Sequence, residues 1–362
     1  MSMGRLAPIL LFGAVLVTPA GCGAGKTPVS PTTPAAPSGT SGMDAEPLRN
    51  AAGASGKLVG AAVQSGLLAD GRYAGVAGRH FNYLTAEYEM KWDAIERARG
   101  SNNFGAGDAI VAFGQAHGMQ IKGHALVWHG SVPGWAGSLS AADFRAAFED
   151  HIRSVGEHFR GRVVAWDVVN EAVADDGSGL RDTVFRQKLG DQYVADAFRL
   201  ARQADPQALL FYNDYGGEGL TAKSDRIYSL VQGLRAQGVP IDGVGLQMHV
   251  NAVSPPGEAN ITSNIRRLVA LGLSVNISEM DVRIRDLPGT APTRLDVQKS
   301  IYHSIVGVCV AEPRCDGITF WGFTDAHSWI DAQYGADDPL IFDDQYAVKP
   351  AYYGVLDALW RR

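Results

Sequence analysis

Two glutamates in this sequence lie at the ends of apolar runs that are typical of buried β-strands. Glu171 closes the run "VVAWDVVNE" at residues 163–171, and Glu279 lies near the end of "LSVNISEMD" at 273–281. Taken alone, a glutamate after a strand is as well explained by capping of the next helix or by solvation in a loop. Two carboxyl groups facing each other across a cleft, however, can hydrolyse a glycoside: one attacks the anomeric carbon, and the other protonates the leaving oxygen.

The strand-like runs that must position these carboxyl groups alternate with segments of helical periodicity. Helical segments include residues 141–159 and 223–238. The alternation predicts an α/β fold, a single (β/α)8 TIM barrel with its catalytic cleft at the C-terminal ends of the strands. A doubly wound open sheet is the main alternative, and the lack of a glycine-rich phosphate loop after the first run weakens it. We predict eight strands, at 58–63, 81–87, 120–128, 163–171, 208–215, 243–249, 273–281 and 317–325.

Polar or aromatic residues end nearly every predicted strand. In a barrel these ends converge on one face, so seven of them are hard to explain as helix caps. The fourth and seventh strands lie across the barrel mouth from each other, which would place Glu171 opposite Glu279. The strand-end residues are Glu87, His124 to His129, Asn170, Glu171, Asn213, Asp214, Tyr215, Gln247, His249, Glu279, Asp281 and Trp321.

Composition and charge exclude several classes of partner. The chain of 362 residues is 46% hydrophobic and 19% charged, as expected for a soluble globular protein, and its net charge of −6 is compatible with a neutral partner or substrate. No basic stripe indicates nucleic-acid binding. The scattered histidines lack paired-ligand spacing, so we predict neither a metal nor another cofactor.

The N-terminal segment predicts export. Residues 1–22 combine one early arginine with a short apolar run, which is the pattern of a signal peptide. The apolar run is too short for a comfortable membrane span. The sequence around Cys22 is similar to a bacterial lipoprotein cleavage site, which predicts a lipid-bearing cysteine and a membrane tether. Pro19 departs from the usual aliphatic residue, and ordinary secretion is the alternative.

A linker and a catalytic domain are expected to follow the signal. Residues 23–46 are rich in Pro, Thr, Ser and Gly and are predicted to be a disordered tether. Residues 47–362 form the predicted catalytic domain, which we expect to be a monomer. Cys309 and Cys315 suit a short-loop disulfide in an oxidising compartment, whereas a two-cysteine metal site or a catalytic thiol is disfavoured.

Several motifs resemble glycoside hydrolase family 10, the (β/α)8 endo-β-1,4-xylanases. They are "TAEYEMKWD", "GHALVWHGSVPGW", "AWDVVNEA", "GLQMH", "ISEMD" and "PLIFDDQYAVKPAYYGV", and they occur in family order from roughly residue 47 to 362. The resemblance implies a retaining endo-1,4-β-xylanase that acts on xylan or xylo-oligosaccharides. It also implies Glu171 as the general acid/base and Glu279 as the nucleophile.

The same resemblance implies roles for other residues. His249 is expected to bond Glu279, and Asp281 to orient His249. Asn170 is expected to contact the sugar 2-hydroxyl, and a Cys309–Cys315 disulfide is frequent in the family. The expected substrate-binding side chains are Glu87, Lys91, His124 and Gln247 on the glycone side, the aromatic walls Trp128, Trp321 and Trp329, and Tyr215 on the aglycone side; Trp92, Trp166 and Trp360 are expected in the core.

Two positions depart from the family pattern. Tyr88 stands where the family usually has an asparagine that contacts the second glycone sugar, so we predict altered binding there with catalysis intact. Ile330 follows Trp329 where the family often has arginine. Three alternatives stay open: the same mechanism on another β-glycoside, a non-catalytic surface carbohydrate-binding protein, and, least favoured, a metal-dependent barrel hydrolase.

Overall fold

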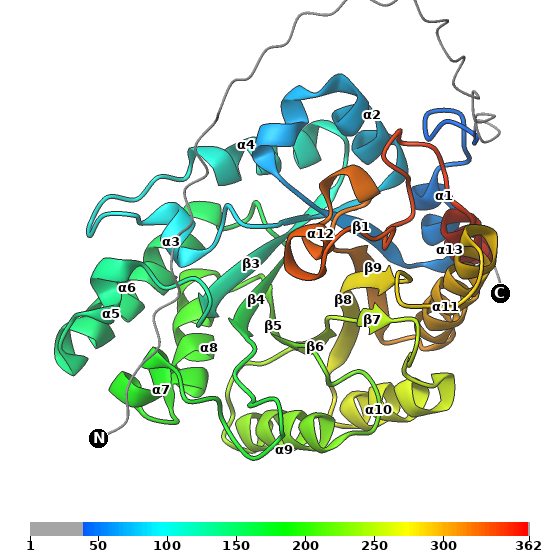
Figure 1. The fold of residues 1–362 in the computed structure, drawn as a ribbon. Helices are drawn as coiled ribbons and strands as arrows, with labels where there is room; N and C mark the ends of the chain where they lie inside the picture. Colours follow the sequence, from blue (N-terminus) through cyan, green and yellow to red (C-terminus); the bar gives the residue numbers. More distant parts are fainter. Residues whose placement is uncertain (1–38, 361–362) are drawn as a thin grey trace, which may run out of the picture. The chain divides into compact units, whose positions relative to one another are not determined.

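Eight parallel strands close into a barrel in the computed structural model, which describes residues 39–360 (Figure 1). Strand β1 pairs with β2 and with β9, and β6 pairs with β8, so each barrel strand has two neighbours. The barrel prediction is confirmed, and the open sheet is excluded by this closure. The barrel strands are β1 (Leu58–Val63), β2 (Tyr83–Ala86), β3 (Gln120–Trp128), β4 (Ala165–Asn170), β5 (Leu209–Asp214), β6 (Gly243–Leu246), β8 (Ser274–Arg283) and β9 (Cys315–Phe320).

The sixth predicted run is divided into two short strands. Strand β6 ends at Leu246, and β7 (His249–Asn251) pairs only with the outer end of β8, where His249 lies opposite Asp281. Between them Met248 has a left-handed backbone, with φ of 67°. A non-glycine residue is uncommon in this region and often marks a functional turn. Periodicity alone could not reveal this break.

Helices surround the barrel and cover the outer face of its strands (Figure 1). The predicted helix at 141–159 is confirmed as α6, whose N-cap Ser140 accepts a hydrogen bond from the backbone of Asp143. The helices are α1 (Leu48–Ser55), α2 (Gly71–His80), α3 (Trp92–Ile95), α4 (Gly105–Ala116), α5 (Gly134–Gly137), α6 (Ala141–Phe159), α7 (Val184–Leu189), α8 (Tyr193–Ala204), α9 (Ala222–Ala236), α10 (Glu258–Ala270), α11 (Ala291–Ala311), α12 (Trp329–Tyr334) and α13 (Pro350–Trp360), with 3₁₀ turns η1 (Ser65–Ala69) and η2 (Asp325–His327).

The strands are buried on both faces, as expected for a parallel barrel under a ring of helices. Trp92 and Trp166 lie in the core, as predicted. The same prediction was wrong for Trp360, which is 49% exposed at the end of α13. A single apolar face suffices for a peripheral helix, so the last residue of α13 need not point inward.

The first described residues pack against the end of the chain. Gly42 donates its backbone N–H to Tyr346 O at 2.9 Å, and Val348 donates to Thr40 O at 2.9 Å. The prediction of a disordered linker is therefore corrected for residues 39–46. The signal sequence, Cys22 and the linker up to residue 38 lie outside the described residues. Within residues 39–360, no helix is both long and apolar enough to cross a membrane.

The C-terminal part of the barrel carries a disulfide. Cys309 in the last turn of α11 is bonded to Cys315, the first residue of β9, with a Cα–Cα distance of 5.1 Å. The predicted pairing is confirmed. The bond joins a peripheral helix to a barrel strand across a loop of five residues.

Candidate active site

A cleft of about 660 Å³ opens where the barrel strands end. Every predicted catalytic or binding residue except Glu87 lines it, while the predicted supporting residue Asp281 lies buried behind His249. The predicted residues that line the cleft are Lys91, His124, Trp128, Asn170, Glu171, Tyr215, Gln247, His249, Glu279, Trp321 and Trp329. The barrel thus brings together side chains from seven of its strand ends.

Glu171 follows β4 with a left-handed backbone, at φ of 59°. Three side chains donate to its carboxylate: Trp128 Nε1 to Oε2 at 2.9 Å, and both Asn170 Nδ2 and Gln247 Nε2 to Oε1 at 3.1 Å. The residue is half-buried, so the carboxyl group is fixed in place yet reachable from the cleft. Capping of the next helix does not explain this position, because α7 begins only at Val184.

Glu279 lies deeper, on β8, and is 4% exposed. Asn213 Nδ2 donates to its Oε1 at 2.6 Å, and His249 Nε2 lies 3.3 Å from Oε2. Burial alone would raise the pKa of Glu279, but the hydrogen bond from His249 and the nearby His124 and Lys91 side chains lower it to about 2. The carboxylate is therefore ionised across the ordinary pH range, as a nucleophile requires.

His249 connects Glu279 to Asp281. Its Nδ1 lies 2.8 Å from Asp281 Oδ2, which also accepts a hydrogen bond from Trp329 Nε1 at 2.9 Å. Burial alone would lower the pKa of His249, but the charge of Asp281 and hydrogen bonds to both carboxylates hold it well above its usual value. A protonated His249 can donate to both acids, so it orients Glu279 and stabilises its charge.

Asn213 joins the two glutamates, and the sequence did not identify it as a site residue. Besides its bond to Glu279, its Nδ2 donates to Asn170 Oδ1 at 2.9 Å, while Ser278 Oγ donates to its Oδ1 at 2.6 Å. Gly245 on β6 leaves room for it, because a Cβ there would lie 2.1 Å from Asn213 Oδ1. The polar strand end "YNDY" was the signal that could have identified this residue.

A column of buried polar groups supports the cleft from inside the barrel. Lys122 Nζ forms an ion pair with Asp167 Oδ1 at 2.7 Å, and Asp167 Oδ2 contacts His124 Nδ1 at 3.0 Å. His124 Nδ1 in turn lies 4.0 Å from Glu279 Oε1. Lys122 and Asp167 lie in the middle of apolar strands, and this pairing explains how both charges are tolerated in the barrel interior.

Lys91 lies in the cleft beside two tryptophans. Its Nζ lies 4.2 Å from the ring of Trp128 and 5.7 Å from that of Trp321. Burial lowers the pKa of Lys91, while the charges of Glu279, Glu87 and Glu171 act in the opposite sense. Gln64 Nε2 donates to Glu87 Oε2 at 3.2 Å, so Glu87 is held beside the cleft rather than in its lining.

Tyr88 lies near Lys91 and is not part of the cleft lining. It is 43% exposed, and its ring lies 5.9 Å from Lys91 Nζ. Partial burial and a hydrogen bond to Asp93 raise the pKa of Tyr88 to about 12. The phenol is therefore directed to a protein carboxylate.

Tyr215 is held in place by charged neighbours. Its hydroxyl donates to Asp175 and accepts from Arg181 Nη2 at 3.0 Å, and Lys223 Nζ lies 3.4 Å from the ring centroid. Arg181 and Lys223 also pair with Asp175, at 2.7 and 3.4 Å. Sequence reasoning did not identify these three supporting residues, because Asp175 and Arg181 come from the loop after β4 and Lys223 comes from α9.

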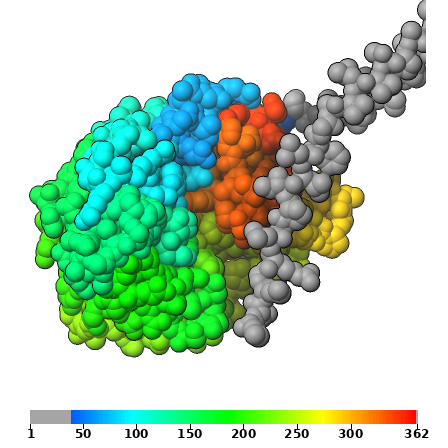
Figure 2. Space-filling view, turned by 60° about the vertical axis from the view of Figure 1, so that its left-hand side comes forward, coloured from blue at the N-terminus to red at the C-terminus, as the bar shows by residue number. Residues whose placement is uncertain are grey.

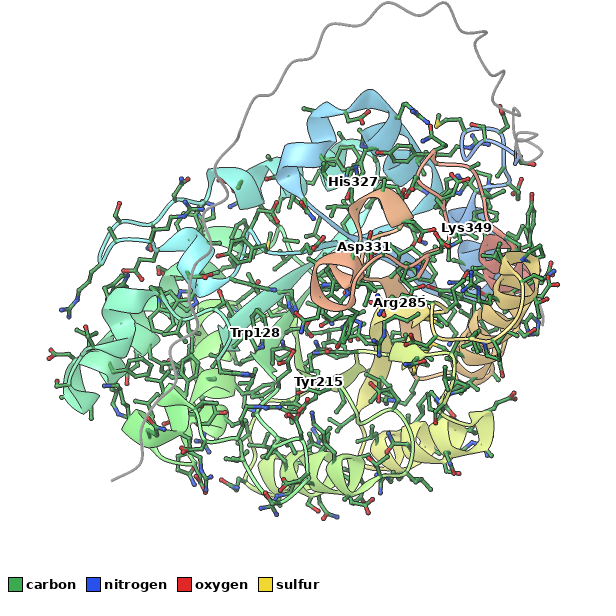
Figure 3. The ribbon with its side chains drawn as sticks, in the orientation of Figure 1. Trp128, Tyr215, Arg285, His327, Asp331 and Lys349 are labelled. Carbon is green, nitrogen blue, oxygen red and sulfur yellow. A yellow bond between two sulfur atoms is a disulfide. The ribbon has the colours of Figure 1, made fainter. Side chains whose placement is uncertain are left out.

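The cleft includes further residues that were not predicted. Glu218 Oε1 accepts the backbone N–H groups of Gly216 at 3.0 Å and Met248 at 3.2 Å, which fixes the turn between Gln247 and His249. Arg283 and Tyr334 line the flank formed by β8 and α12, where Ile330 is fully buried. In Figure 3, Trp128 and Tyr215 lie on one flank of the mouth, and Arg285 and Asp331 lie on the other.

Over residues 39–360, no group of three or more His, Cys, Asp or Glu side chains is arranged to hold a metal ion. Two glutamates, aromatic walls and polar side chains at a barrel mouth define a site able to bind and cleave a neutral sugar chain. The class indicated by fold and site is a barrel glycoside hydrolase.

Comparisons with known proteins agree with this class. The sequence model for glycosyl hydrolase family 10 matches residues 47–358. Endo-1,4-beta-xylanase B of Thermotoga neapolitana is 40% identical over 291 residues, which cover 80% of this chain and 83% of that protein. An endo-1,4-beta-xylanase of Agaricus bisporus is 37% identical over 306 residues, with coverage of 83% and 90%.

Solved structures show the same fold. Xylanase 10B from Thermotoga petrophila in complex with xylobiose superposes with a TM-score of 0.84 at 38% identity, covering 87% of this chain and 97% of that one. The chain belongs to glycosyl hydrolase family 10. This confirms the family resemblance that its motifs indicated.

Proposed function

We propose that this protein is a retaining endo-1,4-β-xylanase with Glu279 as nucleophile and Glu171 as general acid/base. One observation carries the assignment of roles: Glu279 is buried and held as an anion by His249, whereas Glu171 is half-buried and open to the cleft. The relatives named as endo-1,4-beta-xylanases, at 37–40% identity over most of their length, support xylan as the substrate.

In the first step, Glu279 attacks the anomeric carbon while Glu171 protonates the oxygen of the leaving sugar. A covalent glycosyl-enzyme results, and the bond to the leaving chain breaks. Asn170 lies beside both acids, because it donates to Glu171 and accepts from Asn213. It is therefore placed to contact the sugar hydroxyl next to the reacting carbon.

In the second step, Glu171 acts as a base toward water, and water displaces Glu279 from the sugar. Each of the two attacks inverts the configuration at the anomeric carbon, so the product keeps the β configuration. The protonated His249 supports Glu279 in both steps, since it stabilises the carboxylate as it is consumed and as it is released.

Aromatic rings would hold the chain on either side of the cleaved bond. Trp128, Trp321 and Trp329 offer large apolar faces, on which the C–H faces of a sugar ring stack. Tyr215, fixed by Arg181, Asp175 and Lys223, would serve the aglycone side. Lys91, Gln247 and His124 supply the polar contacts that orient the hydroxyl groups.

We also propose that the enzyme is exported, tethered through a lipidated Cys22, and monomeric. The signal-like residues 1–22 and the Pro-rich stretch after them support the first two points. The Cys309–Cys315 disulfide is in keeping with an oxidising compartment. Labelling of the expressed protein with a radioactive fatty acid tests the tether, and Cys22→Ala is its control.

Hydrolysis of xylotetraose, followed by NMR, tests the function. The wild type should release short products that are initially β-configured, and Glu279→Ala should be inactive. A first product of α configuration would contradict retention. A folded wild type that leaves xylotetraose intact, but cleaves another β-glycan from a panel of cellulose and mannan oligomers, would contradict the xylanase assignment.

A further inference from the structure

Arg283 is a cation in the cleft without a carboxylate partner. It extends from the end of β8, is half-buried and lines the cleft. Its guanidinium carbon lies 3.9 Å from the ring centroid of Tyr334. Among residues 39–360, no Asp or Glu oxygen lies within 4.0 Å of its nitrogen atoms.

Lys91, the other basic side chain that lines the cleft besides histidine, and the cations packed around Tyr215 are compensated by acids. Lys91 lies in the field of Glu279, Glu87 and Glu171. Arg181 pairs with Asp175 at 2.7 Å, and Lys223 with Asp214 at 2.9 Å. These cations therefore serve the architecture of the site, whereas the charge of Arg283 is left for something that enters the cleft.

The position of Arg283 relates it to the reaction centre. Residues alternate between the two faces of a strand, so Glu279, Asp281 and Arg283 share one face of β8. Arg283 lies four positions after Glu279, which corresponds to roughly 13 Å between their Cα atoms along the strand. Arg283 therefore leaves the strand nearer the rim of the cleft than Glu279 does, where groups farther along a bound chain, or attached to it, would pass.

The partner that this group fits is a carboxylate. A guanidinium binds a carboxylate through two parallel hydrogen bonds, and such charge-assisted bonds are stronger than bonds to neutral hydroxyls. The xylose backbone carries no charge. Tyr334 is 44% exposed and holds the guanidinium by stacking, so its hydrogen-bonding edge is kept in position without neutralisation of its charge.

We infer that Arg283, on its Tyr334 platform, binds the carboxylate of a uronic acid side group on xylan. The inference rests on the proposed xylanase function and adds a substrate class to it, namely acidic, uronic-acid-substituted xylan. Arg283 is a specificity-determining residue in this account, because it touches the decoration and not the cleaved bond.

The experiment compares two substrates that differ only in this charge: glucuronoxylan, and the same polymer with its carboxyl groups reduced to alcohols. The wild type should have a kcat/KM roughly tenfold or more higher on the acidic form at low salt. The preference should shrink as ionic strength rises, because salt screens exposed charges. In Arg283→Met the ratio of the two kcat/KM values should fall toward one.

Two further variants make the result specific. Arg266→Met removes a guanidinium whose side chain is 73% exposed on α10, and it should keep the wild-type ratio. Arg283→Lys keeps the charge without the fork and should give an intermediate ratio. This variant and the wild-type ratio test the inference even if Arg283→Met does not fold.

Equal kcat/KM of the wild type on both polymers would overturn the inference. So would a loss in Arg283→Met that is the same on both, which would assign Arg283 to support of Tyr334 alone. Cleavage of neutral xylotetraose in the same assay separates the two proposals: if xylotetraose is cleaved without any acid preference, the xylanase function stands and only the role of Arg283 fails.

Discussion

The floor and the rim of the cleft are built in different ways. On the floor, a chain of side-chain hydrogen bonds of 2.6–3.2 Å through Asn170, Asn213 and Gln247 connects Glu171 with Glu279. On the rim, Tyr88 and Tyr334 are more than 40% exposed and contact cations through their rings. The difference teaches that barrel strands fix the chemistry, while loops set what the enzyme accepts.

The floor and the rim also differ in how many hydrogen-bond partners their side chains have within the protein. Each carboxylate on the floor has side-chain donors within the protein, so a substitution there affects its neighbours as well. A rim side chain such as Tyr88 has few partners. Substitutions on the floor should therefore change the rate by orders of magnitude, and substitutions on the rim should change affinity by small factors.

The largest effect is expected at Glu279, which we propose as the nucleophile. Glu279→Gln keeps the shape of the side chain but removes the attacking anion, so kcat on xylotetraose should fall by roughly 10⁴-fold or more. Reducing-sugar release measures it. Glu258→Gln on α10, remote from the cleft, is the matched control and should stay near wild type. A Glu279→Gln enzyme within tenfold of wild type would refute the role of Glu279.

The next largest effect is expected at Asn213. Asn213→Ala removes the donor that is 2.6 Å from Glu279 Oε1 and the link to Asn170, so kcat should fall by about 10²–10³-fold. Asn82→Ala is the matched control: Asn82 accepts from Val59 N–H at 2.8 Å where β1 begins, at the other end of the barrel. Circular dichroism checks that both variants fold. If the control lost as much activity as Asn213→Ala, the effect would be general destabilisation.

His249→Asn should change the pH dependence of the floor. The hydrogen bond from His249 helps to hold the pKa of Glu279 at about 2, and without it this pKa should rise toward the ordinary value of about 4. A raised pKa protonates the nucleophile at higher pH, so the acidic limb of kcat/KM should move upward. His158→Asn, which alters a surface pair with Asp108, should leave the limb in place. An unmoved limb in His249→Asn would show that Glu279 is held as an anion by other groups.

The smallest effect is expected on the rim at Tyr88. Tyr88→Asn restores the family's usual side chain and should change the Kd for xylo-oligosaccharides, and the ratio of short products, by roughly two- to tenfold with kcat nearly intact. Calorimetry on a Glu279→Gln background measures the affinity. Tyr353→Asn, on an exposed tyrosine of α13, is the control. Identical affinity and products in Tyr88→Asn would remove Tyr88 from substrate binding.

The sequence predicted the floor better than the rim for a physical reason. Strand periodicity and polar strand ends locate Glu171 and Glu279, because all barrel strands end on the same face. The sequence did not reveal that Asn213 connects these two glutamates. This position of Asn213 depends on the space that Gly245 leaves on the neighbouring strand. Nor did the sequence show that Asp167 supports His124, because this contact joins two neighbouring strands, β3 and β4.

The rim escaped prediction because its contacts come from distant loops. Arg283 meets Tyr334 through the loop that carries α12, fifty residues farther along the chain, and Tyr215 meets Asp175 and Arg181 from another loop. The surface near this loop is also built from both ends of the domain. The blue segment with α2 and the orange segment with α12 lie side by side in Figure 2, and Arg72 donates to Gln345 O at 2.6 Å.

The central claim is that Glu279 attacks the sugar and Glu171 serves as acid and base. Incubation with a 2-fluoro-xylobioside that carries an activated leaving group traps the covalent intermediate, because the fluorine slows the second step. Peptide mapping by mass spectrometry then identifies the labelled residue. We expect a single fluoro-xylobiosyl group on Glu279. A label on Glu171 or on another residue, or turnover of the reagent to a product of inverted configuration, would contradict the account.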